Sequence, residues 1–153
     1  MSPPGKLLKQ ALHFSLWSCF IAAYLGSAHS ASHEVRIKIG TILASNQSDE
    51  IDPRLAPIRK QFKAFKYRSY RLMKEESQTV PWRADATFKI PGGRTLIVSP
   101  QEFRDKQISL KIHLEGGEKL DTTVRLQNKG NFILGGPAHE GGVLILSISA
   151  TTQ

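Results

Sequence analysis

The residues of this chain whose types and spacing best suit a chemical task are the cations between Arg54 and Lys74, where eight basic side chains occur in one short segment. A local field of this sign attracts phosphate, sulfate and acidic polymers. The residues that we expect to bind such an anionic partner are Arg59, Lys60, Lys63, Lys66, Arg68 and Arg71. The competing interpretation is a solvated surface that serves only solubility, because most runs of charge do no more.

Aromatic residues interleave with these cations at Phe62, Phe65, Tyr67 and Tyr70. Rings and cations in alternation are typical of surfaces that bind single-stranded nucleic acid. These rings, however, recur at the spacings of a helix and of a strand, which favours a place in the core. Nucleic acid is therefore not the partner that we expect, and a protein or an anionic envelope polymer fits the pattern better.

The histidines are a second set of residues that could bind a metal or take part in catalysis. Neither HxH nor HExxH spacing occurs, so His113 and His139 could form a metal site or a polar catalytic cleft only if the fold brought them together.

Two further candidates depend on removal of an N-terminal segment. Cleavage after Ser30 would place His33 third from a free amine, and cleavage after Ala28 would expose His29; either arrangement can chelate copper. Such termini are usually inert, so we expect no metal and no cofactor.

No catalytic motif is present. Residues 135–142 are rich in glycine but lack the Lys-Ser/Thr pair and the following helix of a phosphate-binding loop. The single cysteine, Cys19, lies in the first apolar segment, and a serine or threonine nucleophile would need partners that spacing alone does not reveal. The sequence therefore predicts a protein that is not an enzyme.

The N-terminus is typical of a secretory signal peptide. Lys6 and Lys9 precede a charge-free apolar run from Ala11 to Leu25, and small residues follow. We expect a signal peptide over residues 1–28, cleavage between 28 and 31, a flexible terminus over 29–34, and a periplasmic or secreted product without a membrane span. A retained anchor is the alternative, because the apolar run is at the short limit for crossing a bilayer. The mature chain would carry about +6, since 19 basic residues face 13 acidic ones.

The basic segment needs a scaffold, and the sequence predicts a helix there. Asp52 and Pro53 form a typical helix start. Apolar residues then recur three or four positions apart, so that they share one stripe of the helix: Leu55, Ile58, Phe62 and Phe65. Pro57 disfavours a regular first turn. We expect a helix at about 53–66 whose apolar stripe packs on a sheet.

Alternating apolar residues predict the strands. The segments concerned are 35–42, 70–73, 84–90, 95–98, 108–114, 120–126, 132–134 and 143–149. Segments 75–81 and 135–142 are predicted loops, and the last strand is expected to be central because it is apolar on both faces for much of its length. Residues 35–150 should therefore form a single, mostly β domain: an antiparallel β-sandwich or partly open barrel of about eight short strands with one amphipathic helix packed on it.

The link between the fifth and sixth of these strands permits a prediction of register. A two-residue turn at Gly116-Gly117 would set Leu114 against a lysine and mix apolar and charged residues on one face. A three-residue loop instead pairs Leu114 with Leu120 and His113 with Asp121, so that opposite charges meet and the apolar faces coincide. We therefore expect the longer loop.

Several segments together resemble a family of small, β-rich exported bacterial proteins of the deltaproteobacterial type, whose function is unknown. The segments that carry the resemblance are LASN, DPRLAPI, YRSYRLM, IPGGRTL and LGGPAHEGGVLILSISA. The resemblance implies export and a small domain. It implies no activity and no functional residues.

The function that we expect is that of an exported, non-enzymatic binding domain that engages an anionic partner through its basic segment. The alternative is a structural subunit of a cell-envelope or secretion assembly, in which a sheet edge adds to the strand of a neighbour. The sequence does not indicate the oligomeric state that would distinguish the two.

Overall fold

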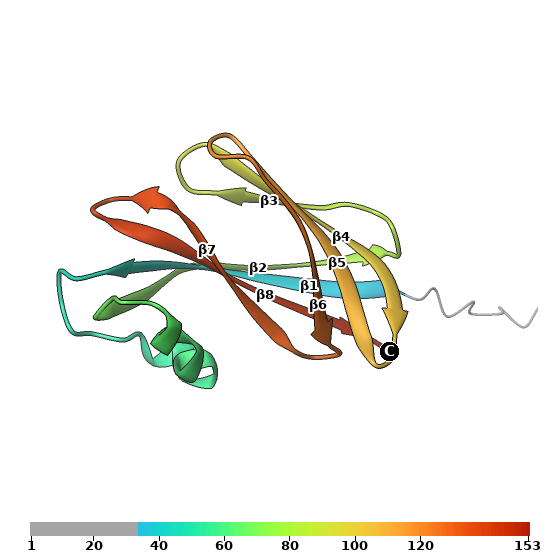
Figure 1. Cartoon of the computed structure of the whole chain (residues 1–153), viewed down its shortest axis with the longest axis horizontal. Helices are drawn as coiled ribbons and strands as arrows, with labels where there is room; N and C mark the ends of the chain where they lie inside the picture. The colour runs from blue at the N-terminus through green and yellow to red at the C-terminus, as the bar shows by residue number, and fades with distance from the viewer. Residues whose placement is uncertain (1–33) are drawn as a thin grey trace, which may run out of the picture. The chain divides into compact units, whose positions relative to one another are not determined.

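The computed structural model describes residues 34–153, so the predicted signal peptide and the candidate metal ligands His29 and His33 lie outside the described residues. The described chain forms eight antiparallel strands and one helix (Figure 1). The elements are β1 (Glu34–Ser45), η1 (Pro53–Ala64), β2 (Ser69–Pro81), β3 (Ala86–Ile90), β4 (Arg94–Arg104), β5 (Gln107–Glu115), β6 (Leu120–Gln127), β7 (Asn131–His139) and β8 (Gly142–Thr152).

The strands form two four-stranded sheets, one in the order β2-β1-β8-β7 and the other in the order β3-β4-β5-β6. The predicted β-sandwich is therefore confirmed, and the described strands do not close into a barrel. The strand β8 lies between β1 and β7, as its apolar faces predicted.

The main core lies between the two sheets. Alternate residues of β1 and β8 point into it, among them Ile37 and Leu146, and they meet residues of the second sheet such as Phe88, Leu96 and Ile112. All five side chains are at most 1% exposed. Each such side chain contributes about 1.5–3 kcal/mol by leaving water, which makes this layer the main source of stability.

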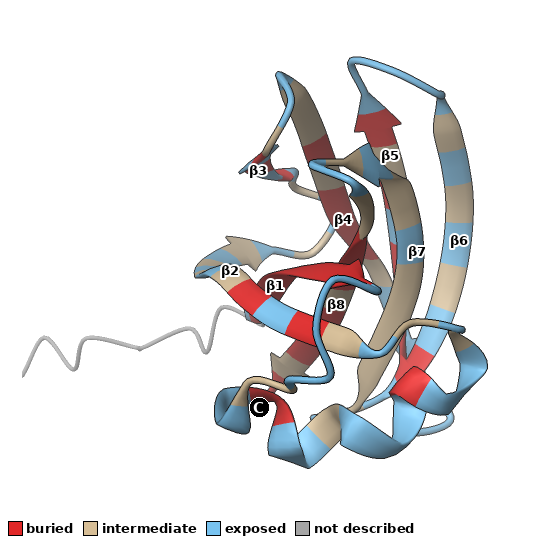
Figure 2. Cartoon of the chain, turned by 90° about the vertical axis from the view of Figure 1, so that its left-hand side faces the viewer, coloured by how far each residue is buried: buried red, intermediate tan, exposed pale blue. Residues whose placement is uncertain are grey.

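A second apolar cluster lies on the other face of the sheet β2-β1-β8-β7, beneath η1. It contains Leu55 and Phe62 of the helix together with Ile42, Tyr70 and Ile145 of three strands. Ile58 and Phe65 pack against it half-buried, so the predicted apolar stripe does face a sheet. This cluster explains why the second half of β1 is buried on both faces, whereas Arg36 and Lys38 in its first half are exposed (Figure 2).

The helix is a 3₁₀-helix rather than the α-helix that a 3.6-residue period indicates, and it ends at Ala64, two residues earlier than predicted. Pro57 lies inside it. A proline at this position lacks an N–H, and its ring clashes with the carbonyl four residues earlier, so a regular α-helix from Pro53 is disfavoured. Within residues 34–153 no helix combines the length and the apolar character needed to cross a membrane.

Two segments predicted as loops are strands. Residues 75–81 continue β2 and pair with the first half of β1, from Gly40↔Glu75 to Glu34↔Pro81. Residues 135–139 continue β7, and an irregularity between Gly135 and Ala138 accommodates the intervening glycine and proline. Both segments lie at sheet edges, where polar residues, glycine and proline are tolerated because one side of the strand needs no partner.

The predicted register of β5 and β6 is confirmed, because Leu114 pairs with Leu120 and His113 with Asp121. The local requirement that like faces coincide therefore outweighed the preference of a Gly-Gly dipeptide for a two-residue turn.

Candidate anion-binding groove

The six cations proposed to bind a partner are all exposed, but the fold does not gather them at one place. Three of them, Arg59, Lys60 and Lys63, line one groove beside η1. Lys66, Arg68 and Arg71 lie outside it. The predicted patch is therefore divided, and the half on the helix is the part whose three cations border the same concave surface.

We call this concavity the basic-aromatic groove. Its volume is about 510 Å³. Its lining is Ile51, Ala56, Arg59, Lys60, Phe62, Lys63, Phe65, Tyr67 and Tyr70. Three cations and four aromatic residues therefore contribute to one surface, and no carboxylate does.

The aromatic wall of the groove is built by contacts between η1 and β2. The rings of Phe62 and Tyr70 stack with their centroids 4.3 Å apart and their planes at 10°. The Tyr70 hydroxyl shares its one proton between two carbonyl oxygens, that of Phe62 at 3.2 Å and that of Phe65 at 3.4 Å. Burial raises the pKa of Tyr70 above its ordinary value, which already lies well above neutral pH, so the hydroxyl is a donor there. The end of the helix is therefore held in one orientation on the strand.

The cations of the groove are unpaired within residues 34–153: Arg59, Lys60 and Lys63 form no ion pair with any described residue. Their charges are therefore not neutralised by a described neighbour. Exposed cations beside low-dielectric walls attract anions more strongly than isolated surface charges do.

The other predicted residues have different surroundings. Arg68 forms an ion pair with Asp49 at 3.4 Å and donates to the Asn46 carbonyl at 2.8 Å, so it has partners of its own. Arg71 lines a separate cavity of about 600 Å³, whose lining also includes Glu50 and Asp52. Mixed charge makes that second cavity a poorer site for an anion.

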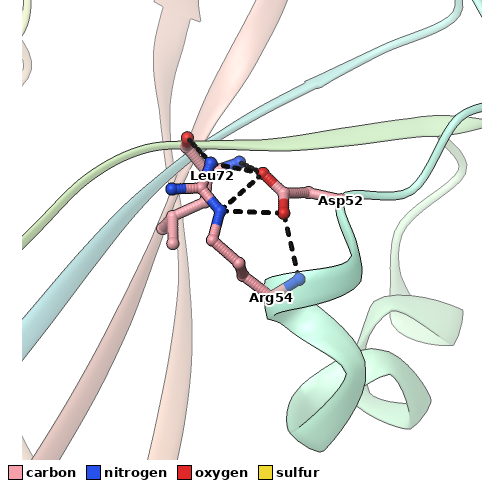
Figure 3. Close-up of polar contacts among 3 residues, drawn as sticks. All are labelled: Asp52, Arg54 and Leu72. Atoms are coloured by element: carbon pink, nitrogen blue, oxygen red, sulfur yellow. Dashed lines mark hydrogen bonds and ion pairs between the residues drawn. The ribbon is translucent and has the colours of Figure 1, made fainter.

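Asp52 fixes the start of η1 to the edge of β2 (Figure 3). One carboxylate oxygen accepts from the Arg54 backbone N–H at 3.0 Å, and the other accepts from the Arg54 Nη2 at 2.6 Å and from the Leu72 N–H at 3.3 Å. Arg54 in turn donates to the Leu72 carbonyl at 3.1 Å. The hydrogen bonds from Arg54 hold the pKa of Asp52 well below its usual range. The pair thereby occupies both backbone groups of Leu72, as a neighbouring strand would.

The two histidines in the described part of the chain, His113 and His139, each contact acidic residues of their own. His113 lies on the outer face of β5 between Asp121, which it contacts through Nδ1, and Glu115, which is 3.1 Å from Nε2. His139 ends β7 and its Nε2 is 3.6 Å from Glu140. Among residues 34–153 no three metal-ligating side chains come together in a way that would hold a metal ion.

Sequence reasoning missed Ile51 and Ala56 as parts of the groove. Ile51 joins it because residues 50–52 pair with β2, with Tyr70 N–H donating to the Glu50 carbonyl at 3.0 Å and Asp52 N–H to the Tyr70 carbonyl at 2.9 Å. No local pattern in the sequence indicates this parallel bridge. Ala56 lies in the segment DPRLAPI but outside the apolar stripe of the helix, so the helical period gave it no place in a site.

No family model matches this chain, and comparisons with curated proteins and with solved structures find no match. The resemblance to exported bacterial proteins therefore remains an expectation from the sequence, and the function has to be argued from the site.

Proposed function

We propose that this chain is an exported, non-enzymatic binding domain that engages an anionic partner through its basic-aromatic groove. The observation that carries the proposal is the concentration of Arg59, Lys60 and Lys63 on a groove with no carboxylate in its lining.

Export is supported by the charge-free apolar run near the N-terminus. The intact mass of protein recovered from its native host would test export, since cleavage after residue 28 or 30 predicts a defined loss.

The binding proposal is tested by removing the three charges of the groove. In the variant R59Q/K60Q/K63Q, binding to inorganic polyphosphate should weaken at least about tenfold at low salt, because counterion release is lost with the cations. In a plot of the logarithm of the binding constant against the logarithm of the salt concentration, the slope should become shallower by about 1 for each phosphate contact removed. Titration calorimetry at several salt concentrations measures both quantities.

A matched variant separates site binding from the effect of net charge. K111Q/K119Q/R125Q removes the same number of exposed cations from β5, β6 and their connection, in the other sheet. Its affinity and salt slope should change much less than those of the groove variant. Equal losses in the two variants would mean that the groove cations act only through overall charge, and would contradict the proposal.

A second function is favoured by one feature of the sheets. The strand β6 is the edge of its sheet, eight residues long and without glycine or proline. Two other edges are partly protected: Asp52 and Arg54 occupy Leu72 of β2, and the Gln78 side chain binds both backbone groups of Thr87 in β3, at 2.5 and 3.3 Å. An open edge strand is a template for another chain. The alternative function is therefore that of a structural subunit that assembles through β6.

A further inference from the structure

The basic-aromatic groove contains more apolar surface than the binding of a simple anion requires. Phe65 and Tyr67 are half-buried on its wall, next to the stacked pair of Phe62 and Tyr70. The Phe65 ring lies over the backbone of β7: a side-chain carbon at Gly135 would be only 3.4 Å from its Cε1 atom. Phe65 therefore lies beside β7 as well as lining the groove.

The groove is held in shape by its own contacts. Tyr70 is 3% exposed and Phe62 4%, and the Tyr70 hydroxyl joins the last turn of η1 to β2. Packing and hydrogen bonds therefore hold Phe62 and Tyr70 in place, so these side chains do not collapse into the groove. A ligand would meet a site that is already formed and would lose little affinity in ordering it.

The charges are arranged at the side of this apolar surface. Arg59, Lys60 and Lys63 are exposed along η1, whereas Phe65 and Tyr67 are half-buried against the apolar cluster and still line the groove. A ligand that satisfies both parts needs an anionic head and an apolar body in the same molecule. Inorganic anions satisfy only the first part, and neutral hydrocarbons satisfy only the second.

The volume of the groove indicates the size of that molecule. About 510 Å³ lies within the range of roughly 300–1,000 Å³ that is usual for sites of small organic ligands. A groove of this volume fits a single small molecule that contacts the cations and the apolar lining together.

We propose that the groove binds a free single-chain amphiphilic anion, an alkyl carboxylate or alkyl phosphate, with its head at Arg59, Lys60 and Lys63 and its chain against the aromatic wall. This inference rests on the proposed function, because it specifies the anion that the groove engages. It goes beyond that function by assigning a role to the apolar surface.

Alkyl phosphates of increasing length, kept below their micellar concentrations, test the proposal by titration calorimetry with the full mature chain. Octyl and decyl phosphate should bind, and each added methylene should tighten binding up to about fourfold as it leaves water. Inorganic phosphate and the uncharged octyl glucoside should bind at least about tenfold more weakly than octyl phosphate.

Two variants locate the site. Ala56 is exposed and lines the groove, so Ala56→Trp should obstruct the groove without disturbing the core, and should weaken decyl phosphate binding at least about tenfold while polyphosphate binding persists. Phe103→Trp is the matched control, because Phe103 is an exposed ring on β4, 49% accessible and outside the groove. It should bind decyl phosphate like the unaltered protein.

The possible results are distinct. Equal affinity for decyl and inorganic phosphate, or an unchanged affinity in Ala56→Trp, would overturn the amphiphile site while leaving the anion-binding function in place. Binding to anionic phospholipid vesicles but not to free decyl phosphate would overturn it in favour of a membrane surface. Failure of the unaltered protein to bind any anion, polyphosphate included, would overturn the amphiphile site and the proposed function together.

Discussion

His113 illustrates how a single residue on the outer face of a sheet acquires a pH-dependent role. Its ring lies between Asp121 and Glu115, and the hydrogen bond to Asp121 is the main cause that raises the pKa of His113 above its ordinary value. Both ring nitrogens can donate only when the imidazole is protonated. The arrangement thus stabilises the imidazolium form.

This arrangement predicts a dependence of stability on pH. Because the folded protein binds the proton more tightly than the unfolded chain, the stabilisation is complete below about pH 6.5 and is lost as the pH rises through the raised pKa. His113→Gln should therefore lower the melting temperature at pH 5.5 and differ less from the unaltered protein at pH 9. Thermal unfolding across this range measures the effect.

A direct titration of the ring is the control for this interpretation. The His113 resonance in NMR spectra should titrate above about pH 6.5. A midpoint at or below that value would show that the two carboxylates do not stabilise the protonated ring in solution.

At the scale of elements, the junction between η1 and β2 decides where the basic segment lies. Asp52 caps the first turn of η1 and, with Arg54, takes the place of a neighbouring strand at Leu72. The Asp52 side chain is only 11% exposed, whereas that of Arg54 is 66% exposed. The carboxylate is therefore the fixed member of the pair, and the helix position depends on it.

Asp52→Asn tests this junction with little change in shape. Asparagine remains a good helix cap, but it loses the charge that Arg54 pairs with, so the melting temperature at pH 7 should fall. Because the pKa of Asp52 is lowered in the folded state, its contribution is present above about pH 4 and is lost as the pH falls further. The difference between the two proteins should therefore narrow at acidic pH.

The matched control is Glu118→Gln, which removes one negative charge from an exposed position between β5 and β6. It should leave the melting temperature at pH 7 nearly unchanged. If Asp52→Asn also left the melting temperature unchanged, the Asp52–Arg54 pair would be an exposed ion pair of the kind that contributes little to stability.

At the scale of the whole molecule, the sandwich leaves its two candidate functions on different sheets. The groove belongs to η1 and the sheet β2-β1-β8-β7, whereas the open edge β6 belongs to the sheet β3-β4-β5-β6. One function needs only a single copy of the chain. The other needs contact between chains.

The mass of the protein in solution distinguishes these functions. We expect a monomer across micromolar concentrations, since binding through the groove requires no second copy, and light scattering coupled to size-exclusion chromatography measures it. Ordered oligomers that persist at low concentration would instead favour assembly through β6.

Much of the fold was accessible from the sequence because it depends on local alternation. Apolar residues at every second position define the inward faces of strands, so the sandwich, the central place of β8 and the pairing of His113 with Asp121 could be predicted. The extent of β2 and β7 could not. Residues 75–81 are polar, and they form a strand only because the first half of β1 offers them a partner.

The sequence by itself determined that cations and aromatic rings share the segment from Arg54 to Lys74, and that an apolar stripe would attach its helix to a sheet. Only the tertiary structure decided that Arg59, Lys60 and Lys63 border the basic-aromatic groove, whereas Arg68 and Arg71 lie outside it. The physical reason is that a helical or strand period orders side chains within one element. The groove arises between elements, from the stacking of Phe62 on Tyr70 and the bridge of Ile51 to β2.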